Sequence, residues 1–166
     1  MADTPAPKLA TPTDLKSNAL SSVADALNAA LADCFALYIK TKNFHWHVSG
    51  PHFRDYHLLM DDQATQIYEV TDAIAERVRK TGNTTLRSIG DIARHQTIKD
   101  NDAQFVSAEN MLAELRDDNL KLVESFRTVK ELAEEAKDNA TSGIVDEWTD
   151  QAEERAWFLF EASRKA

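Results

Sequence analysis

Apolar side chains recur at intervals of three and four residues along most of this sequence, and that period is typical of amphipathic helices. The first periodic stretch predicts a long helix from about Asp14 to Val48, with apolar positions at Leu20, Val23, Leu27, Leu31, Cys34 and Tyr38. Thr13 or Asp14 is its expected N-cap. We expect the helix to end before Gly50 and Pro51, because proline cannot continue the backbone hydrogen-bond ladder.

Three more long periodic stretches predict helices over residues 53–80, 107–138 and 142–164. Ser107 is the expected N-cap of the second of these. The connection over residues 83–102 is long for two helices of a bundle, and residues 86–95 within it predict a short helix. Four long helices with one long central connection predict an all-α, ferritin-like four-helix bundle in up-down-down-up order.

The N-terminal residues have a different character. Residues 1–13 contain Pro5, Pro7 and Pro12 among small and polar residues, so we expect a flexible arm before one bundle domain over residues 14–166. The sequence has no run of 18 apolar residues and no apolar signal-peptide core after Met1. We therefore expect a cytoplasmic protein that does not span a membrane.

Composition narrows the function classes further. Lys and Arg number 19 against 28 Asp and Glu, which gives a formal net charge of −9. Such a surface repels phosphate backbones and disfavours DNA as a partner. The single cysteine, Cys34, excludes an intramolecular disulfide framework and a multi-thiolate zinc site.

Histidines and carboxylates gather in residues 45–76. Four of the five histidines lie there, followed by four carboxylates: His45, His47, His52, His57, Asp61, Asp62, Asp72 and Glu76. Imidazole and carboxylate together suit iron, manganese or zinc. No Glu-x-x-His motif occurs in the chain, so we expect no di-iron site inside a single bundle.

Helical spacing places the candidate ligands of residues 53–80 on one face. At about 100° per residue, His57, Asp61, Asp72 and Glu76 fall within about 100° of one another. The apolar positions of the same helix cluster on a different side, at Met60, Ile67, Val70, Ile74 and Val78. The ligand face therefore points away from the bundle core, toward solvent or another subunit.

A two-fold axis would bring the two ends of that face together. Asp61 and Asp72 are about 16 Å apart along the helix, too far to share one ion. The pairs His57/Glu76 and Asp61/Asp72 share a midpoint, so an antiparallel mate would place each residue beside its counterpart. His45 could complete this inter-subunit set. From spacing alone, a solvated acidic face explains the same carboxylates about equally well.

Two segments of the sequence resemble the signatures of a known protein family. The run from Asn43 to Asp62, NFHWHVSGPHFRDYHLLMDD, resembles the signature of the Dps family of bacterial mini-ferritins. The segment DAIAERVR, from Asp72 to Arg79, resembles the second signature of that family. The order and lengths of the predicted helices agree over nearly the whole chain after the arm.

The resemblance implies a ferroxidase, which oxidises Fe(II) preferentially with hydrogen peroxide and stores Fe(III) mineral in a hollow homododecamer built from two-fold dimers. It thereby protects the cell from oxidative damage. The implied metal ligands are His45, His57 and Asp61 from one subunit with Asp72 and Glu76 from its mate. Trp46 corresponds to a tryptophan beside that catalytic centre, and iron is the implied metal.

Two implied traits concern charge. Many members of the family bind DNA through a lysine-rich arm, whereas Lys8 and Lys16 are here offset by Asp3 and Asp14. A nucleoid-associated, DNA-binding structural protein with a secondary metal site is the alternative. The family also has acidic three-fold pores, for which the candidates are Glu134, Glu135, Asp138, Asp146 and Asp150.

Overall fold

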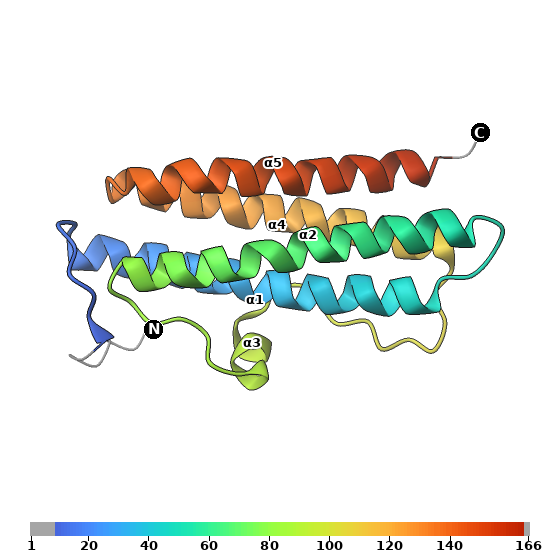
Figure 1. The fold of residues 1–166 in the computed structure, drawn as a ribbon, viewed down its shortest axis with the longest axis horizontal. Helices are drawn as coiled ribbons and strands as arrows, with labels where there is room; N and C mark the ends of the chain where they lie inside the picture. The colour runs from blue at the N-terminus through green and yellow to red at the C-terminus, as the bar shows by residue number, and fades with distance from the viewer. Residues whose placement is uncertain (1–8, 165–166) are drawn as a thin grey trace.

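Four long helices lie side by side in the computed structural model, which describes residues 9–164 (Figure 1). The helices are α1 Ser17–His47, α2 Phe53–Lys80, α3 Ile89–His95, α4 Ala108–Glu135 and α5 Asn139–Ala162. Helices α1 and α5 run in one direction, and α2 and α4 run in the other (Figure 1). The long connection that contains α3 runs along the bundle from the end of α2 to the start of α4. This arrangement confirms the predicted all-α bundle and its up-down-down-up order.

The helix ends agree with the predictions for α2 and for the start of α4, but not for the start of α1. Helix α2 spans the predicted residues, and the Ser107 side chain caps α4 by accepting a hydrogen bond from the Asn110 amide. The predicted cap at Thr13 or Asp14 is wrong, because α1 begins at Ser17 without a side-chain cap. The Thr13 hydroxyl instead accepts a hydrogen bond from the Leu15 amide.

The predicted arm lies mostly outside the described residues, which begin at Leu9. The Leu9 carbonyl accepts a hydrogen bond of 2.7 Å from the Arg79 guanidinium. Gly82, with φ +84°, lies so close to Thr11 that a Cβ there would be 2.9 Å from the Thr11 carbonyl oxygen. The last residues of the predicted arm therefore pack against the C-terminal end of α2. Its flexibility stays a prediction.

Helix α1 is the central element of the core, since it packs against α2, α3 and α4, while α4 packs against α5. Its apolar side chains are fully buried at Leu20, Val23, Leu27, Cys34 and Leu37. By length and composition alone, α1 is long and apolar enough to cross a membrane. Packing in the bundle accounts for that apolar character, because these side chains form the protein core.

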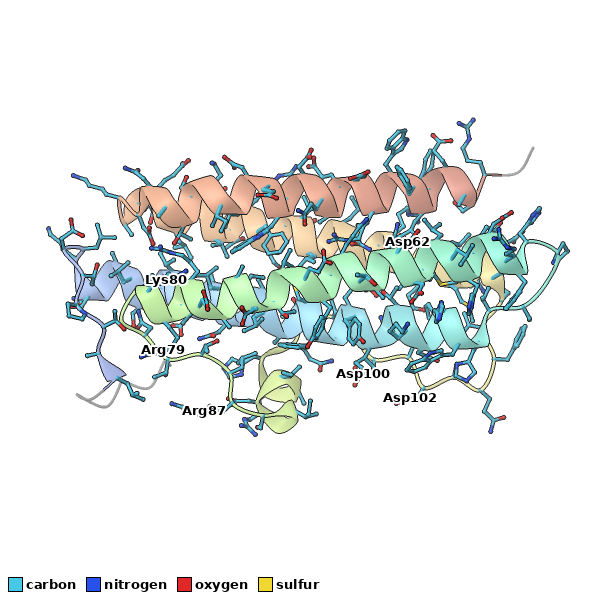
Figure 2. The ribbon with its side chains drawn as sticks, in the orientation of Figure 1. Asp62, Arg79, Lys80, Arg87, Asp100 and Asp102 are labelled. Carbon is cyan, nitrogen blue, oxygen red and sulfur yellow. The ribbon has the colours of Figure 1, made fainter. Side chains whose placement is uncertain are left out.

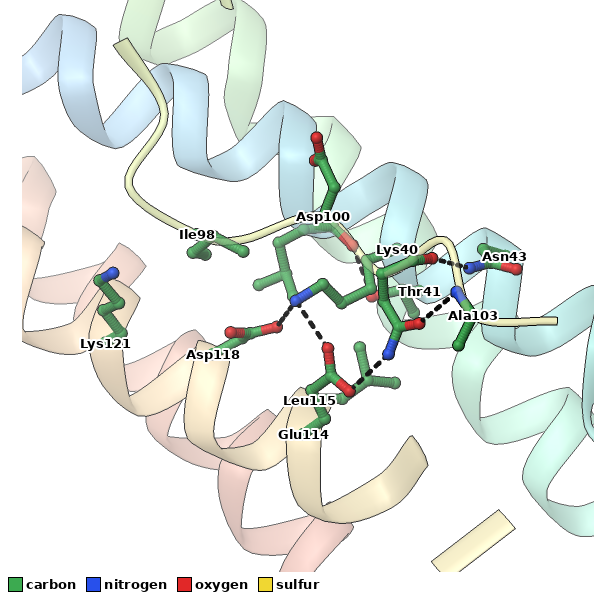
Figure 3. A network of polar contacts seen from close by, with 12 residues as sticks. Lys40, Thr41, Asn43, Ile98, Asp100, Ala103, Glu114, Leu115, Asp118 and Lys121 are labelled. Carbon is green, nitrogen blue, oxygen red and sulfur yellow. Dashed lines mark hydrogen bonds and ion pairs between the residues drawn. The ribbon is translucent and has the colours of Figure 1, made fainter. Parts of the chain in front are cut away.

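Two polar clusters around buried side chains of α1 join that helix to later parts of the chain. The Asp33 carboxylate accepts hydrogen bonds from the Thr97 hydroxyl at 2.8 Å and the Ile98 amide at 2.9 Å. Lys40 forms ion pairs with Asp118 at 2.7 Å and Glu114 at 3.0 Å (Figure 3). Burial raises the pKa of Asp118 above its usual value. The Asp33 contacts hold the crossover against α1, whereas the Lys40 ion pairs join α1 to α4.

Candidate metal centre

His45 and His57 orient each other where α1 ends and α2 begins. Their rings stack with centroids 3.8 Å apart and planes inclined by 19°. The Nδ1 of His45 lies 2.7 Å from the His57 carbonyl oxygen, and the Nδ1 of His57 lies 2.8 Å from the His45 carbonyl oxygen. Because a carbonyl only accepts, each Nδ1 donates to it, and in a neutral ring this tautomer leaves the Nε2 lone pair free. This arrangement prepares both rings to bind a metal through Nε2.

Asp61 supplies the carboxylate of the same cluster. Its Oδ1 lies 3.9 Å from the Nε2 of His45. An ion bound about 2.0–2.2 Å from each atom would fit between them. The same Oδ1 accepts a hydrogen bond of 2.7 Å from the Lys42 ammonium, which lowers the pKa of the Asp61 carboxyl below its usual value.

Asp72 and Glu76 lie farther along α2 and have much less support. Both are exposed, and among residues 9–164 the one ion pair of Glu76 is with Lys80, one turn later, with an Nζ–Oε2 distance of 3.3 Å. Within residues 9–164, no three His, Cys, Asp or Glu side chains converge well enough to hold a metal ion. A single chain thus presents two separate groups of candidate ligands, as helical spacing predicts.

Within residues 9–164, the interior of the bundle contains a buried cation. Arg155 is almost fully buried there and donates a hydrogen bond of 2.8 Å to the Asn119 side chain. Burial lowers the pKa of Arg155 to about 10 and raises the pKa of the Cys34 thiol to about 12. Arg155 is therefore a cation and Cys34 a neutral thiol at neutral pH. A buried positive charge disfavours a metal ion beside it.

Asp62, the neighbour of Asp61, lies on a different face of α2, as helical geometry predicts. Asp62 lies on the side of α2 that faces α5 (Figure 2) and lines a small cavity of about 90 Å³ with Gln63 and Arg155. Asp61 instead contacts Lys42 of α1. Adjacent carboxylates thus face different helices, and only Asp61 belongs to the histidine cluster.

Trp46 and two further histidines, His47 and His95, have their own contacts. Trp46 is 61% exposed, and its ring lies 5.9 Å from the Lys42 ammonium. The exposed His47 and His95 each direct Nδ1 to the carbonyl of the residue four positions earlier, at 2.8 Å. Sequence analysis missed Lys42, although it precedes His45 by three residues and therefore shares its helical face.

An exposed apolar hollow lies beside the ligand face. Its volume is about 690 Å³, and residues of α1, α2, α3 and the crossover line it, among them Tyr38, Ile39, Tyr68, Ile89 and Ile92. Tyr68 lies on the ligand face, about 20° from His57 around the helix. Its ring packs against Tyr38 with centroids 5.2 Å apart, and its side chain is still half exposed.

One of the acidic pore candidates is wrong. Asp138 is buried, accepts hydrogen bonds from the Thr141 amide and hydroxyl as the N-cap of α5, and pairs with Arg77 at 3.0 Å. These contacts occupy its carboxylate and leave none of it for an open pore. Sequence analysis started α5 at Ser142 and so missed this cap.

Comparisons with known proteins agree with the fold. The ferritin-like domain family matches residues 24–165. A DNA protection during starvation protein from Agrobacterium fabrum is 32% identical over 90% of this chain and 92% of its own length. A protein of the same name from Brevibacillus brevis is 30% identical over 87% of this chain and 97% of its own length. A low temperature-induced protein from Nostoc sp. is 36% identical over 82% and 77%.

Solved structures of Dps proteins have the same fold as this chain. The Dps protein from Bacillus brevis superposes with a TM-score of 0.85 at 29% identity, covering 90% of this chain and 100% of that one. DpsC from Streptomyces coelicolor superposes with a TM-score of 0.89 at 25% identity, covering 94% and 91%.

Proposed function

The chain belongs to the Dps family of ferritin-like proteins, and on that premise we propose that it is an iron-oxidising and iron-storing mini-ferritin of the cytoplasm. Membership of this family supports an iron-storage role in general. The ferroxidase activity, the preference for hydrogen peroxide and the hollow homododecamer are the finer parts of the proposal.

The observation that carries the proposal is the reciprocal hydrogen bonding of His45 and His57 next to Asp61. Two histidines and one carboxylate are a ligand set suited to Fe(II) centres with open coordination positions. The histidines keep their Nε2 lone pairs free, and the carboxylate stabilises Fe(III) more than Fe(II). These ligands therefore favour the loss of an electron from bound iron.

The proposed reaction uses two ferrous ions for each peroxide. Each Fe(II) gives up one electron, the O–O bond breaks, and two protons convert the peroxide into two waters. The resulting Fe(III) hydrolyses and enters the stored mineral. Iron is thus a substrate, and peroxide and ferrous iron are consumed together before they can form hydroxyl radicals.

We propose that a second copy of the chain completes the centre with its Asp72 and Glu76. Thr65 and Tyr68 share the midpoint of the pairs His57/Glu76 and Asp61/Asp72, and both lie on the ligand face. In an antiparallel pair, each Tyr68 would meet the Thr65 of the other copy, and both apolar hollows would be covered. Repetition of such dimers would build the dodecamer.

A complementation experiment tests the shared centre. One variant carries His57→Ala and Asp61→Ala, and a second carries Asp72→Ala and Glu76→Ala. Each alone should oxidise Fe(II) slowly. Co-expression pairs them at random, so half the dimers are mixed and each mixed dimer has one intact centre, which restores about a quarter of the native sites. Mixed assemblies with no recovery above either parent would contradict a centre shared by two chains.

The alternative, a DNA-binding structural protein, is favoured only by the name of the relatives from Agrobacterium fabrum and Brevibacillus brevis. The net charge of −9 opposes it. We expect no plasmid retention in a gel at physiological salt. Retention that is lost after deletion of residues 2–12 would favour the alternative.

A further inference from the structure

We propose that Lys42 acts as a built-in competitor of the metal, an internal cation that the incoming ion must displace from Asp61. This inference rests on the proposed metal centre and adds a positioning residue to it. The Lys42 ammonium sets how tightly the His45/His57/Asp61 half of the centre binds its first divalent ion.

The first argument is the position of the ammonium. Lys42 Nζ lies 2.7 Å from Asp61 Oδ1, and His45 Nε2 lies 3.9 Å from that same oxygen atom. Oδ1 is thus the Asp61 oxygen that faces both the ammonium and His45, so a metal ion bound there between Asp61 and His45 would meet the ammonium. Ammonium and metal are both cations, so they compete for one carboxylate oxygen and repel each other at short range.

The second argument is the shielding of Lys42. Its side chain is only 19% exposed, and its ammonium lies 5.9 Å from the ring of Trp46. The cation therefore has a second favourable contact on its own helix, which keeps it near the site after displacement. Because the charge stays close, its repulsion continues to weaken metal binding.

The chain contains a matched pair for comparison. Lys80 contacts Glu76 in the other half of the predicted centre at 3.3 Å, but its side chain is 61% exposed. Water screens such an exposed pair, and its ammonium can move away freely. Both lysines thus pair with a predicted metal ligand, and they differ in how far they can leave it.

Titration of the assembled, metal-free protein with Co²⁺ under anaerobic conditions, followed by visible absorption and calorimetry, tests the proposal. We expect Lys42→Met to bind Co²⁺ on the order of tenfold more tightly than the native protein, because one nearby positive charge is gone. Lys42→Arg keeps the charge and should bind within about threefold of native. Lys80→Met should likewise change the affinity by less than about threefold.

The direction of the change separates this role from a structural one. If Lys42 merely joins α1 to α2, Lys42→Met should bind Co²⁺ no more tightly than native, which would overturn the proposal. An equal gain in Lys80→Met or in Lys42→Arg would overturn it as well. Lys42→Gln gives the same comparison if Lys42→Met does not fold. A native protein that binds no Co²⁺ would instead contradict the proposed metal centre itself.

Discussion

The two ends of α2 carry matching ligands in very different surroundings. At the N-terminal end, His57 and Asp61 are held by His45 and Lys42 of α1 through hydrogen bonds, ring stacking and an ion pair. At the C-terminal end, Asp72 and Glu76 are exposed, and Glu76 pairs with the exposed side chain of Lys80. One half of the predicted centre is therefore organised within a single chain, whereas the other half is not.

The difference in surroundings indicates which half of the predicted centre selects the metal ion. A side chain with fixed orientation loses little entropy when it binds a metal, while an exposed Asp or Glu must first be ordered. The organised half should therefore select and bind the first ion. The exposed half should contribute charge once a second copy places it nearby.

The largest effect should follow from loss of the organised half. We expect His57→Ala or Asp61→Ala to slow peroxide-driven Fe(II) oxidation by about 100-fold or more, since even the loss of a ligand-orienting group costs 10–100-fold. Stopped-flow absorbance of Fe(III) formation measures this rate, and circular dichroism checks the fold. Asp62→Asn is the control and should react at nearly the native rate, since Asp62 faces α5. A similar loss in Asp62→Asn would contradict the helical-face argument.

A smaller loss should follow from changes in the exposed half. Glu76→Gln keeps the shape of the side chain but removes its charge, so we expect Fe(II) oxidation to slow by about tenfold. The same stopped-flow measurement compares it with Asp61→Asn. If Glu76→Gln were the more damaging of the two, the proposed division between selecting and assisting halves would be wrong.

Stability should separate the two halves in the metal-free protein. His45→Ala removes a stacked ring and leaves the His57 carbonyl without its donor, so the free energy of unfolding should fall by about 1–2 kcal/mol. Asp72→Ala removes an exposed side chain and should change it by less than about 0.5 kcal/mol. Urea unfolding followed by circular dichroism measures both values. Equal losses would mean that the organised half has no special structural support.

The smallest expected effect concerns Asp118, a carboxylate that belongs to neither half of the predicted centre, and the pH dependence of stability. Burial raises the pKa of Asp118, so the folded protein binds that proton more tightly than the unfolded chain. Acidification through this pKa therefore favours folding at Asp118, and Asp118→Asn removes the benefit. The urea midpoint of unfolding should therefore decrease more between pH 7 and pH 4.5 for Asp118→Asn than for the native protein. The opposite order would assign Asp118 a lowered pKa.

The periodic pattern of apolar residues predicted much of the fold. Residues 53–80 form α2 as predicted, and Ser107 caps α4, because both signals depend on side chains a few residues apart. The start of α1 was predicted too early, since Thr13 bonds to the local Leu15 amide and leaves the helix without a side-chain cap. The site followed the same rule, because helical geometry alone separates Asp61 from Asp62.

The pattern along the chain was sufficient to predict the four amphipathic helices and the ligand face of α2 from side-chain spacing, and the helix order from the long connection. The packing of the helices sets which ligands are organised. It stacks His45 on His57, places Lys42 against Asp61, and buries Asp138 under Arg77. Each of these contacts joins different helices, and their geometry depends on how the helices pack. A pattern read along one helix carries no information about the charge that a neighbouring helix brings to it.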